Sequence, residues 1–294
     1  MIHTLDLDFL NTPQAIAAYL VETSDGPVLI ESGPYSTYEA LRAEVQRVGF
    51  ALEDVRHVLL THIHFDHAGA AWALAEQGAT VYVHPVGAPH LANPEKLWSS
   101  AKRIYQDEMD RLWGEMRPIP EAQLREVGHQ ETLTFGNTTL MAHHTPGHAT
   151  HHIAYQLEHN VFTGDVGGVR IGKGIVEPPC PPPDIHLEDW QHSIQLLHDL
   201  HPRHLYLTHF GRVDQVAEHL NTLYAQLVRW ADWVHERMDG RSADELAPEF
   251  TAYVERQLRS HGASDEQVRQ YEAANPSWMS VAGLMRYWKK KEEV

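Results

Sequence analysis

Cysteine is almost missing from this sequence, and its scarcity limits the folds that the chain can adopt. Cys180 is the single cysteine among 294 residues. A disulfide framework needs cysteines in pairs, and cysteine-rich zinc modules need several in one chain. The chain must therefore depend on an ordinary hydrophobic core, for which its length and its 43 % of apolar residues are sufficient.

Long apolar runs and an excess of positive charge are missing as well. No run approaches the ~20 apolar residues of a membrane-spanning helix, and the opening MIHTLDLDFLNT lacks the basic and apolar regions of a secretory signal. Asp and Glu outnumber Lys and Arg by 40 to 23, which gives a formal net charge of −17. Such an acidic chain is poorly suited to nucleic acid or an anionic membrane. We therefore expect a cytoplasmic protein whose partner is a small molecule, with no nucleic acid and no membrane.

Histidine, by contrast, is unusually frequent, with 23 copies. The densest group is His62-Ile63-His64-Phe65-Asp66-His67, which follows a short β-branched and leucine run over residues 55–61. A loop that leaves the end of a strand can direct alternate side chains at one point. Neutral imidazole and carboxylate are the ligands expected for zinc and similar divalent cations. The cluster therefore predicts a metal site.

Strand-like and helix-like segments alternate through residues 1–212, which is typical of a mixed α and β fold. Alternating apolar runs predict strands over 17–22, 28–31, 80–84, 132–135 and 138–143, and a last strand over 204–208. Apolar residues at helical spacing predict helices over 37–48 and 188–200. The class is α+β.

Two segments interrupt or follow this alternation. Residues 86–120 predict a helical insertion, and its Trp98, Tyr105 and Trp113 would pack in a local core or roof the active site. Residues 213–294 predict a helical appendage with capping boxes at Ser242…Glu245 and Ser264…Gln267. In this appendage an apolar stripe predicts a core-packed helix, with a homodimer interface as the alternative. The stripe comprises Leu220, Leu223, Leu227, Trp230 and Val234.

Four motifs in order resemble the signature of the metallo-β-lactamase-fold hydrolases, and the resemblance runs from about residue 15 to residue 211. They are HxHxDHxG at His62–Gly69, Thr145-Pro146-Gly147-His148, Thr163-Gly164-Asp165 and Leu207-Thr208-His209-Phe210-Gly211. The resemblance implies a four-layer αββα sandwich with two mixed sheets face to face. The metals would lie at one sheet edge, overhung by the insertion and the C-terminal helices.

The resemblance also implies a site for two divalent ions, Zn²⁺ first and Mn²⁺ or Fe as alternatives. The first ion would be held by His62, His64 and His148, the second by Asp66, His67 and His209, with Asp165 bridging both. A hydroxide shared by the two ions would attack the substrate, and Asp66 would orient it as a catalytic residue. The implied activity is hydrolysis of a small carboxylic ester, thioester or lactone, as in the glyoxalase II and lactonase branches.

Some residues depart from the family pattern and bear on the substrate. Cys180 matches no ligand motif, which disfavours a true β-lactamase with a cysteine ligand. No tyrosine follows Asp165 within Val166-Gly167-Gly168-Val169, although lactonases often have one there. Arg170 and Lys173 come next and are the candidates for binding a substrate carboxylate, with a solvated loop as the alternative.

Other activities remain open at this point. Persulfide dioxygenases share the fold and bind one iron through residues that correspond to His62, His148 and Asp165, so the metal content would distinguish them. A phosphodiesterase that acts on small molecules is the third possibility. A nucleotide-binding loop is rejected, because the glycine-rich stretch after Asp165 has Gly174 where Ser or Thr should contact magnesium.

Overall fold

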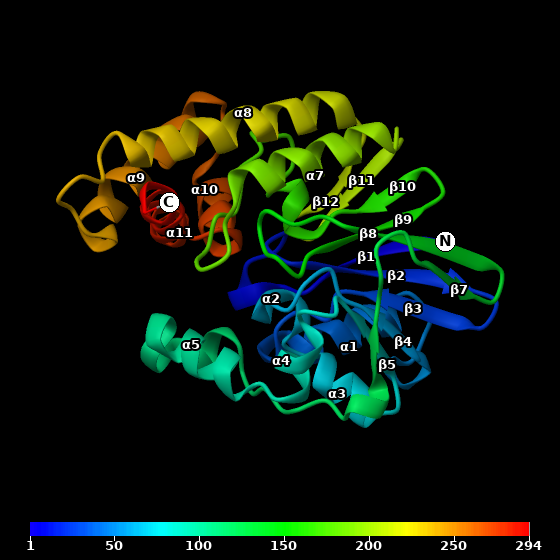
Figure 1. Ribbon diagram of the computed structural model, residues 1–294. Coiled ribbons are helices and arrows are strands. Elements are labelled where there is room, and N and C mark those ends of the chain that lie inside the picture. Colours follow the sequence, from blue (N-terminus) through cyan, green and yellow to red (C-terminus); the bar gives the residue numbers. More distant parts are fainter. Residues whose placement is uncertain (294) are drawn as a thin grey trace.

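Two six-stranded sheets form the centre of the computed structural model, which describes residues 1–293 (Figure 1). The first sheet has the order β1 (Ile2–Asp6), β2 (Ala17–Thr23), β3 (Gly26–Ile30), β4 (His57–Leu59), β5 (Thr80–Val83) and β6 (Leu124–Glu126). The second has the order β12 (Gly211–Val213), β11 (His204–Leu207), β10 (Asn160–Phe162), β9 (Ile153–Leu157), β8 (Thr138–His144) and β7 (Thr132–Phe135). Each sheet combines parallel and antiparallel pairs, so the prediction of two mixed sheets is confirmed.

Apolar side chains fill the space between the sheets. The ring of Tyr19 in β2 lies 5.3 Å from that of Phe162 in β10 and 5.4 Å from that of Tyr206 in β11, measured between centroids. The next residue, Leu20, belongs instead to the apolar cluster that reaches the outer helices. Because successive side chains of a strand point to opposite faces, β2 packs against the other sheet and against helices at once.

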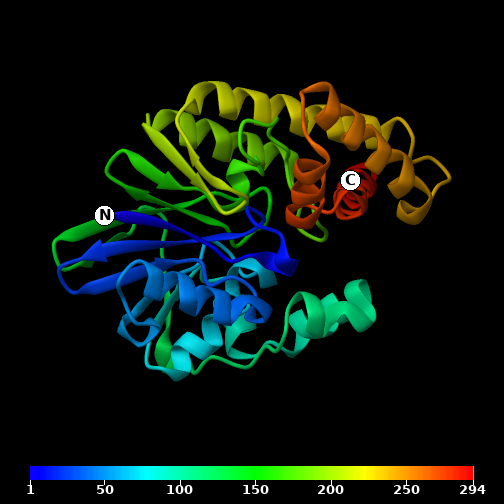
Figure 2. The ribbon, with the colours of Figure 1, turned by 180° about the vertical axis from the view of Figure 1, so that it is seen from behind.

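Helices cover the outer faces of both sheets (Figures 1 and 2). The first sheet is covered by α1 (Tyr38–Arg47), α3 (Ala71–Glu76) and α4 (Ala88–Ala92), and the second by α7 (Leu187–Asp199) and α8 (Val216–His235). The apolar stripe of α8, from Leu220 to Val234, is buried within the chain. The predicted αββα sandwich is confirmed.

The insertion and the C-terminal segment are helical, as expected. Beyond α4, the insertion contains α5 (Glu95–Tyr105) and α6 (Met109–Leu112), and α8 is followed by α9 (Ala243–Ser260), α10 (Asp265–Ala274) and α11 (Ser277–Glu292). Both capping boxes form, with Ser242 accepting from the Glu245 amide and Ser264 from the Gln267 amide. In Figures 1 and 2, α5 projects on the same side of the sandwich as α10 and α11. Within residues 1–293, no helix combines the length and apolar character needed to cross a membrane.

The expectation that the strand at 204–208 would be the last is wrong. Gly211 takes a φ of 83° and returns the chain as β12, which pairs antiparallel with β11 and places Gly211 opposite Leu207. A strand of three residues is too short to show an alternating pattern. The expected domain boundary at 212 falls inside this strand, so the second sheet extends one residue into the segment assigned to the appendage.

Candidate metal centre

Loops at one edge of both sheets bring the predicted ligands together. In the first sheet, β4 ends at Leu59, and the loop beyond it carries His62 and His64 before the short helix α2 (Phe65–Ala68) carries Asp66 and His67. In the second sheet, loops after three different strands carry the remaining ligands: His148 follows β8, Asp165 follows β10 and His209 follows β11. The seven side chains thus come from four segments that are far apart in the sequence.

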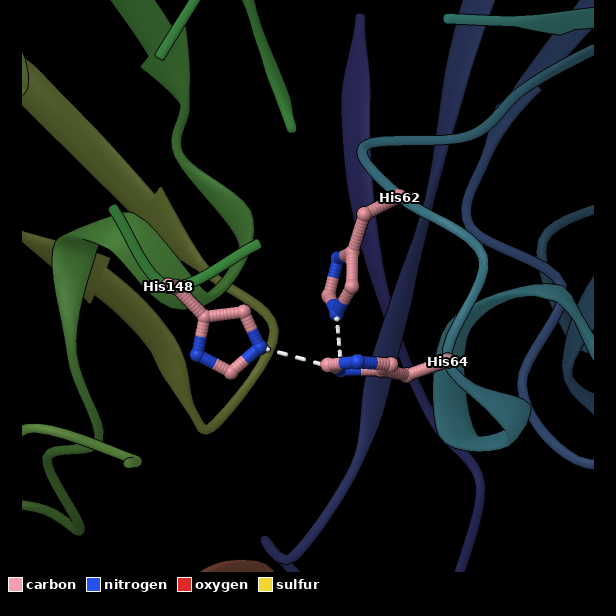
Figure 3. A group of neighbouring side chains, drawn as sticks. All are labelled: His62, His64 and His148. Carbon is pink, nitrogen blue, oxygen red and sulfur yellow. Dashed lines mark hydrogen bonds between the residues drawn. The ribbon is translucent and has the colours of Figure 1, made fainter. Parts of the chain in front are cut away.

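The first group consists of His62, His64 and His148. Nδ1 of His64 lies 2.9 Å from Nε2 of His62 and 3.0 Å from Nε2 of His148 (Figure 3). One nitrogen from each ring lies within 4.8 Å of the others. Figure 3 shows His148 approaching from the side opposite to His62 and His64. These are the three residues expected for the first ion.

The second group consists of Asp66, His67 and His209. Oδ2 of Asp66 lies 3.6 Å from Nε2 of His67 and 3.4 Å from Nε2 of His209. The three ligand atoms again lie within 4.8 Å of one another. These are the residues expected for the second ion.

Asp165 lies between the two groups. Its Oδ2 is 3.2 Å from Nε2 of His148 in the first group, whereas its Oδ1 is 3.1 Å from Nε2 of His67 and 3.4 Å from Nε2 of His209 in the second. Each carboxylate oxygen therefore faces a different group, which is the arrangement that a bridging ligand requires.

The outer nitrogens of the histidines are held by the protein. Four of the five ligand rings have an oxygen close to Nδ1: Thr61 Oγ1 for His62 (3.0 Å), Glu31 Oε1 for His67 (2.9 Å), the Pro179 carbonyl for His148 (2.8 Å) and the Ala15 carbonyl for His209 (2.7 Å). Such contacts fix the ring orientation and direct the other nitrogen, Nε2, toward the centre.

Glu31 contacts the ligand loops and was not among the residues that the sequence patterns singled out. Its side chain is buried, accepts hydrogen bonds from Thr61 Oγ1 (2.5 Å), the Thr61 amide (3.2 Å) and Thr208 Oγ1 (3.2 Å), and faces His67. Its φ of 66° is unusual for a residue with a side chain. The sequence offered one indication of its role, which is that a charged residue directly follows the apolar strand β3.

Two glycines allow the ligand loops to approach this closely. Gly147, with φ of 134°, precedes His148, and a Cβ on it would lie 2.3 Å from the Cα of Trp190. Gly164, with φ of 49°, precedes Asp165, and its Cβ would lie 2.5 Å from Thr61 Oγ1. Both positions combine a backbone conformation that favours glycine with a lack of space, so a side chain at either one would displace the adjacent ligand.

The donor set fits divalent cations. Within the described part of the chain, His67 Nε2, His209 Nε2 and Asp165 Oδ1 are buried without a hydrogen-bond partner, although buried polar atoms are normally satisfied. Burial, helped by neighbouring imidazoles, lowers the pKa of His62 well below its usual value and that of His64 to about 4, so these rings are neutral ligands. Imidazole and carboxylate groups in this mixture are suited to zinc and related metals.

In the second group, contacts between carboxylates and imidazoles determine the direction of the pKa shifts. Burial alone would lower the pKa of His209, but Asp165 and Asp66 raise it to about 9. Burial would raise the pKa of Asp66, but the neighbouring His67 and His209 lower it to about 2, so Asp66 is ionised at neutral pH. The carboxylates therefore stabilise positive charge in the second group, where the pKa of His67 is raised as well, and a bound cation can take the place of the protons on its imidazoles.

A cavity of about 830 Å³ opens above the centre, and His64, Asp66 and Asp165 form part of its lining. Arg170 and Lys173 do not line it. Nε of Arg170 donates to the carbonyl of Gly174 at 3.0 Å, and Lys173 is exposed on the same loop. The structure therefore brings all seven predicted ligands together. The Arg170 amide donates to the carbonyl of His209 at 2.6 Å, but neither Arg170 nor Lys173 lines the cavity.

The three aromatic residues of the insertion have different positions. Tyr105 and Trp113 line the cavity, whereas Trp98 packs edge-on against Phe65 with ring centroids 5.8 Å apart. Tyr105 and Trp113 also contact each other, with centroids 5.1 Å apart. All three residues thus pack against other aromatic rings, and two of them also line the cavity.

Comparison with known proteins adds evidence that is independent of the site geometry. Residues 11–209 match the family model described as "Metallo-beta-lactamase superfamily". A metallo-beta-lactamase fold-containing protein of Sulfurisphaera tokodaii is 24 % identical over 231 residues, which cover 76 % of this chain and 85 % of that protein. A crystal structure of a metallo-beta-lactamase family protein from Thermus thermophilus has a TM-score of 0.74 at 21 % identity, covering 99 % of this chain and 93 % of the other.

One further relative has a name that states an activity. The atrochrysone carboxyl ACP thioesterase of Aspergillus fumigatus is 26 % identical over 229 residues, which cover 77 % of this chain. The match spans 45 % of the fungal protein, so more than half of that protein lies outside the shared region.

Proposed function

The chain belongs to the metallo-beta-lactamase superfamily, and on this premise we propose that it is a hydrolase that binds two divalent metal ions and cleaves a carboxylic ester, a thioester or a lactone. The observation that carries the proposal is the position of Asp165, whose two carboxylate oxygens face two separate groups of ligands. A single ion beside His62 and His148 would use Oδ2 of Asp165, whereas Oδ1 faces His67 and His209 of a second complete group of ligands.

The metal ions supply the chemistry that the side chains lack. When bound, two divalent cations lower the pKa of water toward neutrality and polarise the carbonyl of a substrate. Zn²⁺ is the first choice for this donor set, and Mn²⁺ or Fe accept the same ligands.

Asp66 is the residue of this chain that we assign to the reaction itself. It is ionised, it lines the cavity, and its Oδ2 lies between Nε2 of His67 and Nε2 of His209. A carboxylate in this place accepts a hydrogen bond from the attacking water and so holds the oxygen lone pair toward the substrate carbonyl. The similarity to a fungal protein named as a thioesterase supports thioesters among the candidate substrates.

The first test is the metal-to-chain ratio of the purified protein, measured by elemental mass spectrometry, followed by a screen of esters, thioesters and lactones. We expect about two zinc or manganese ions per chain and hydrolysis that stops on chelation and returns with the metal. Asp165→Ala is the matched inactive control. One iron per chain, with oxygen consumption in the presence of a persulfide and no hydrolysis, would overturn the proposal in favour of a dioxygenase.

A further inference from the structure

We propose that the substrate carries a bulky apolar acyl group, which the cavity between the helical insertion and the C-terminal helices holds against the metal centre. This inference rests on the proposed hydrolase function and adds the class of substrate. It differs from the sequence-based expectation of a small substrate, because the cavity of about 830 Å³ is large enough for a drug-sized molecule.

The cavity is lined by segments that lie far apart in the sequence. Its walls come from α5 and α6 of the insertion, from the proline-rich loop at 179–183, and from the turn between α10 and α11. The N-terminal segment contributes Phe9, Leu10 and Ile16. The metal centre forms one wall through His64, Asp66 and Asp165. The apolar space is therefore continuous with the place where the proposed reaction occurs.

Apolar side chains dominate this lining, and several stay exposed. Val86, Ile104 and Trp278 are 51 %, 36 % and 38 % exposed, and all three line the cavity. Large apolar side chains left open to water in one place indicate a binding site rather than ordinary surface. Deeper in, the ring of Trp113 stacks against Phe9 and Phe65 at 5.8 and 5.9 Å between centroids, which forms a continuous aromatic wall.

Most of the charged groups in the lining away from the metal centre already have partners within the protein. Nε of Arg111 donates to Glu108 at 2.6 Å, Asp184 accepts from Thr150 at 3.2 Å, and Glu272 accepts from Ser277 Oγ at 2.9 Å. Lys96 also lines the cavity, and the described residues provide no side-chain partner for it; elsewhere in the lining an anionic or strongly polar substrate body would have to break these contacts. An apolar body would instead gain affinity from each methylene that it removes from water.

The geometry also sets the orientation of the substrate. The scissile carbonyl lies at the wall formed by Asp66 and Asp165, and the apolar acyl chain extends toward Trp113 and α5. In the reaction, the oxygen of water forms a bond to the acyl carbon and the bond from this carbon to sulfur or oxygen breaks. The thiol or alcohol leaves with a proton, and the product is an apolar carboxylic acid.

A series of acyl thioesters of N-acetylcysteamine tests the inference, because the leaving group is small, polar and constant. We expect kcat/KM to rise from acetyl through hexanoyl to decanoyl, by up to about fourfold for each methylene that becomes buried. The matching methyl esters cover the case of an enzyme that prefers oxygen esters. The thiol product is measured with a thiol reagent, and Cys180 does not interfere because it is buried.

Two neighbouring serines of α5 provide a matched pair of variants. Ser100 lines the cavity, Ser99 does not, and both are exposed, so neither substitution disturbs the core. We expect Ser100→Trp to lower kcat/KM for the decanoyl substrate by about tenfold or more, as obstruction of an apolar pocket does. The acetyl substrate should change little in this variant, and Ser99→Trp should change neither substrate.

A binding measurement tests the apolar cavity independently of hydrolysis. Decanoyl-N-acetylcysteamine is titrated into metal-free protein by calorimetry, where it is not consumed, and we expect Ser100→Trp to weaken its binding. If the metal-loaded enzyme cleaves all chain lengths equally, or Ser100→Trp affects them equally, the inference fails while the hydrolase function stands. If no substrate is cleaved but the metal-free protein binds the decanoyl compound and Ser100→Trp weakens this binding, the hydrolase function fails and the cavity retains its apolar ligand.

Discussion

Oε1 of Glu31 lies 2.9 Å from Nδ1 of His67, and both side chains are almost completely inaccessible to solvent. The carboxylate comes from the end of β3 and the imidazole from α2, so this contact joins the first sheet to the second group of metal ligands. Because the same carboxylate also accepts from Thr61 and Thr208, it joins the segment that carries His62 to His67 to the loop that carries His209.

Glu31→Gln should weaken metal binding at the second group. An amide keeps the size of the side chain but removes the charge that favours the orientation of His67, and loss of such a partner typically lowers metal affinity by about 10- to 100-fold. Competition with a chelator of known affinity measures the two binding steps. Glu53→Gln, which removes an exposed carboxylate bonded to Arg42, is the control. Unchanged affinity in both steps would show that Glu31 has a purely structural role.

His209→Ala and Asp165→Ala should differ in the number of ions that they lose. His209 contributes to the second group alone, so its removal should leave about one ion per chain at the three histidines of the first group. Asp165 faces both groups, so Asp165→Ala should lose both ions and most of the activity. Elemental analysis after dialysis against a defined metal buffer gives the ratio, and two retained ions in Asp165→Ala would exclude a bridging role.

The first cluster of ligands was predictable from the residues alone, because His62, His64, Asp66 and His67 fall within six residues after one strand. His148, Asp165 and His209 are isolated in the sequence, so their place in the ligand set, and the sheet edge that holds the metals, followed from the resemblance of their motifs to the family signature. The αββα arrangement followed from the family resemblance, since periodicity alone predicts strands and helices but not their layers.

The features that the sequence did not reveal depend on contacts between distant parts of the chain or on the direction of a side chain. Glu31 is 36 residues from His67, and nothing in its local sequence states that the two meet. Arg170 follows Asp165 closely, yet its side chain turns to the carbonyl of Gly174 rather than into the cavity. The cavity itself is formed by the insertion and the C-terminal turn, whose relative position no local pattern encodes.

Arg170→Ala should affect anionic and neutral substrates equally. The guanidinium group bonds to its own loop and does not line the cavity, so its loss should remove one hydrogen bond and about 1 kcal/mol of stability without a selective change in KM. The measurement compares KM for thioesters of the same acyl group with a neutral and a carboxylate-bearing thiol. A KM that rises only for the carboxylate-bearing substrate would restore the role that the sequence suggested.

The Glu177→Gln variant should lose less stability than the wild type as the pH rises. Glu177 is 2 % exposed, its Oε2 accepts a hydrogen bond from Asn275 Nδ2 at 3.4 Å, and burial raises the pKa of its carboxyl to about 8 from an ordinary value of 4.5. The folded state therefore retains a proton that the unfolded state releases. Between pH 4.5 and pH 8 the wild type should lose stability as the pH rises, by up to about 1.4 kcal/mol for each pH unit.

The difference in unfolding free energy between variant and wild type reports the titration of Glu177, because the histidines of the metal centre are the same in both proteins. Urea denaturation of metal-free protein at several pH values should give a free energy of unfolding for Glu177→Gln that approaches or falls below that of the wild type near pH 5 and exceeds it near pH 9. Glu218→Gln changes an exposed carboxyl and should give a nearly constant difference. A constant difference for Glu177→Gln as well would mean that Glu177 is ionised in the folded protein, and that Asn275 and the surrounding backbone stabilise its charge in spite of burial.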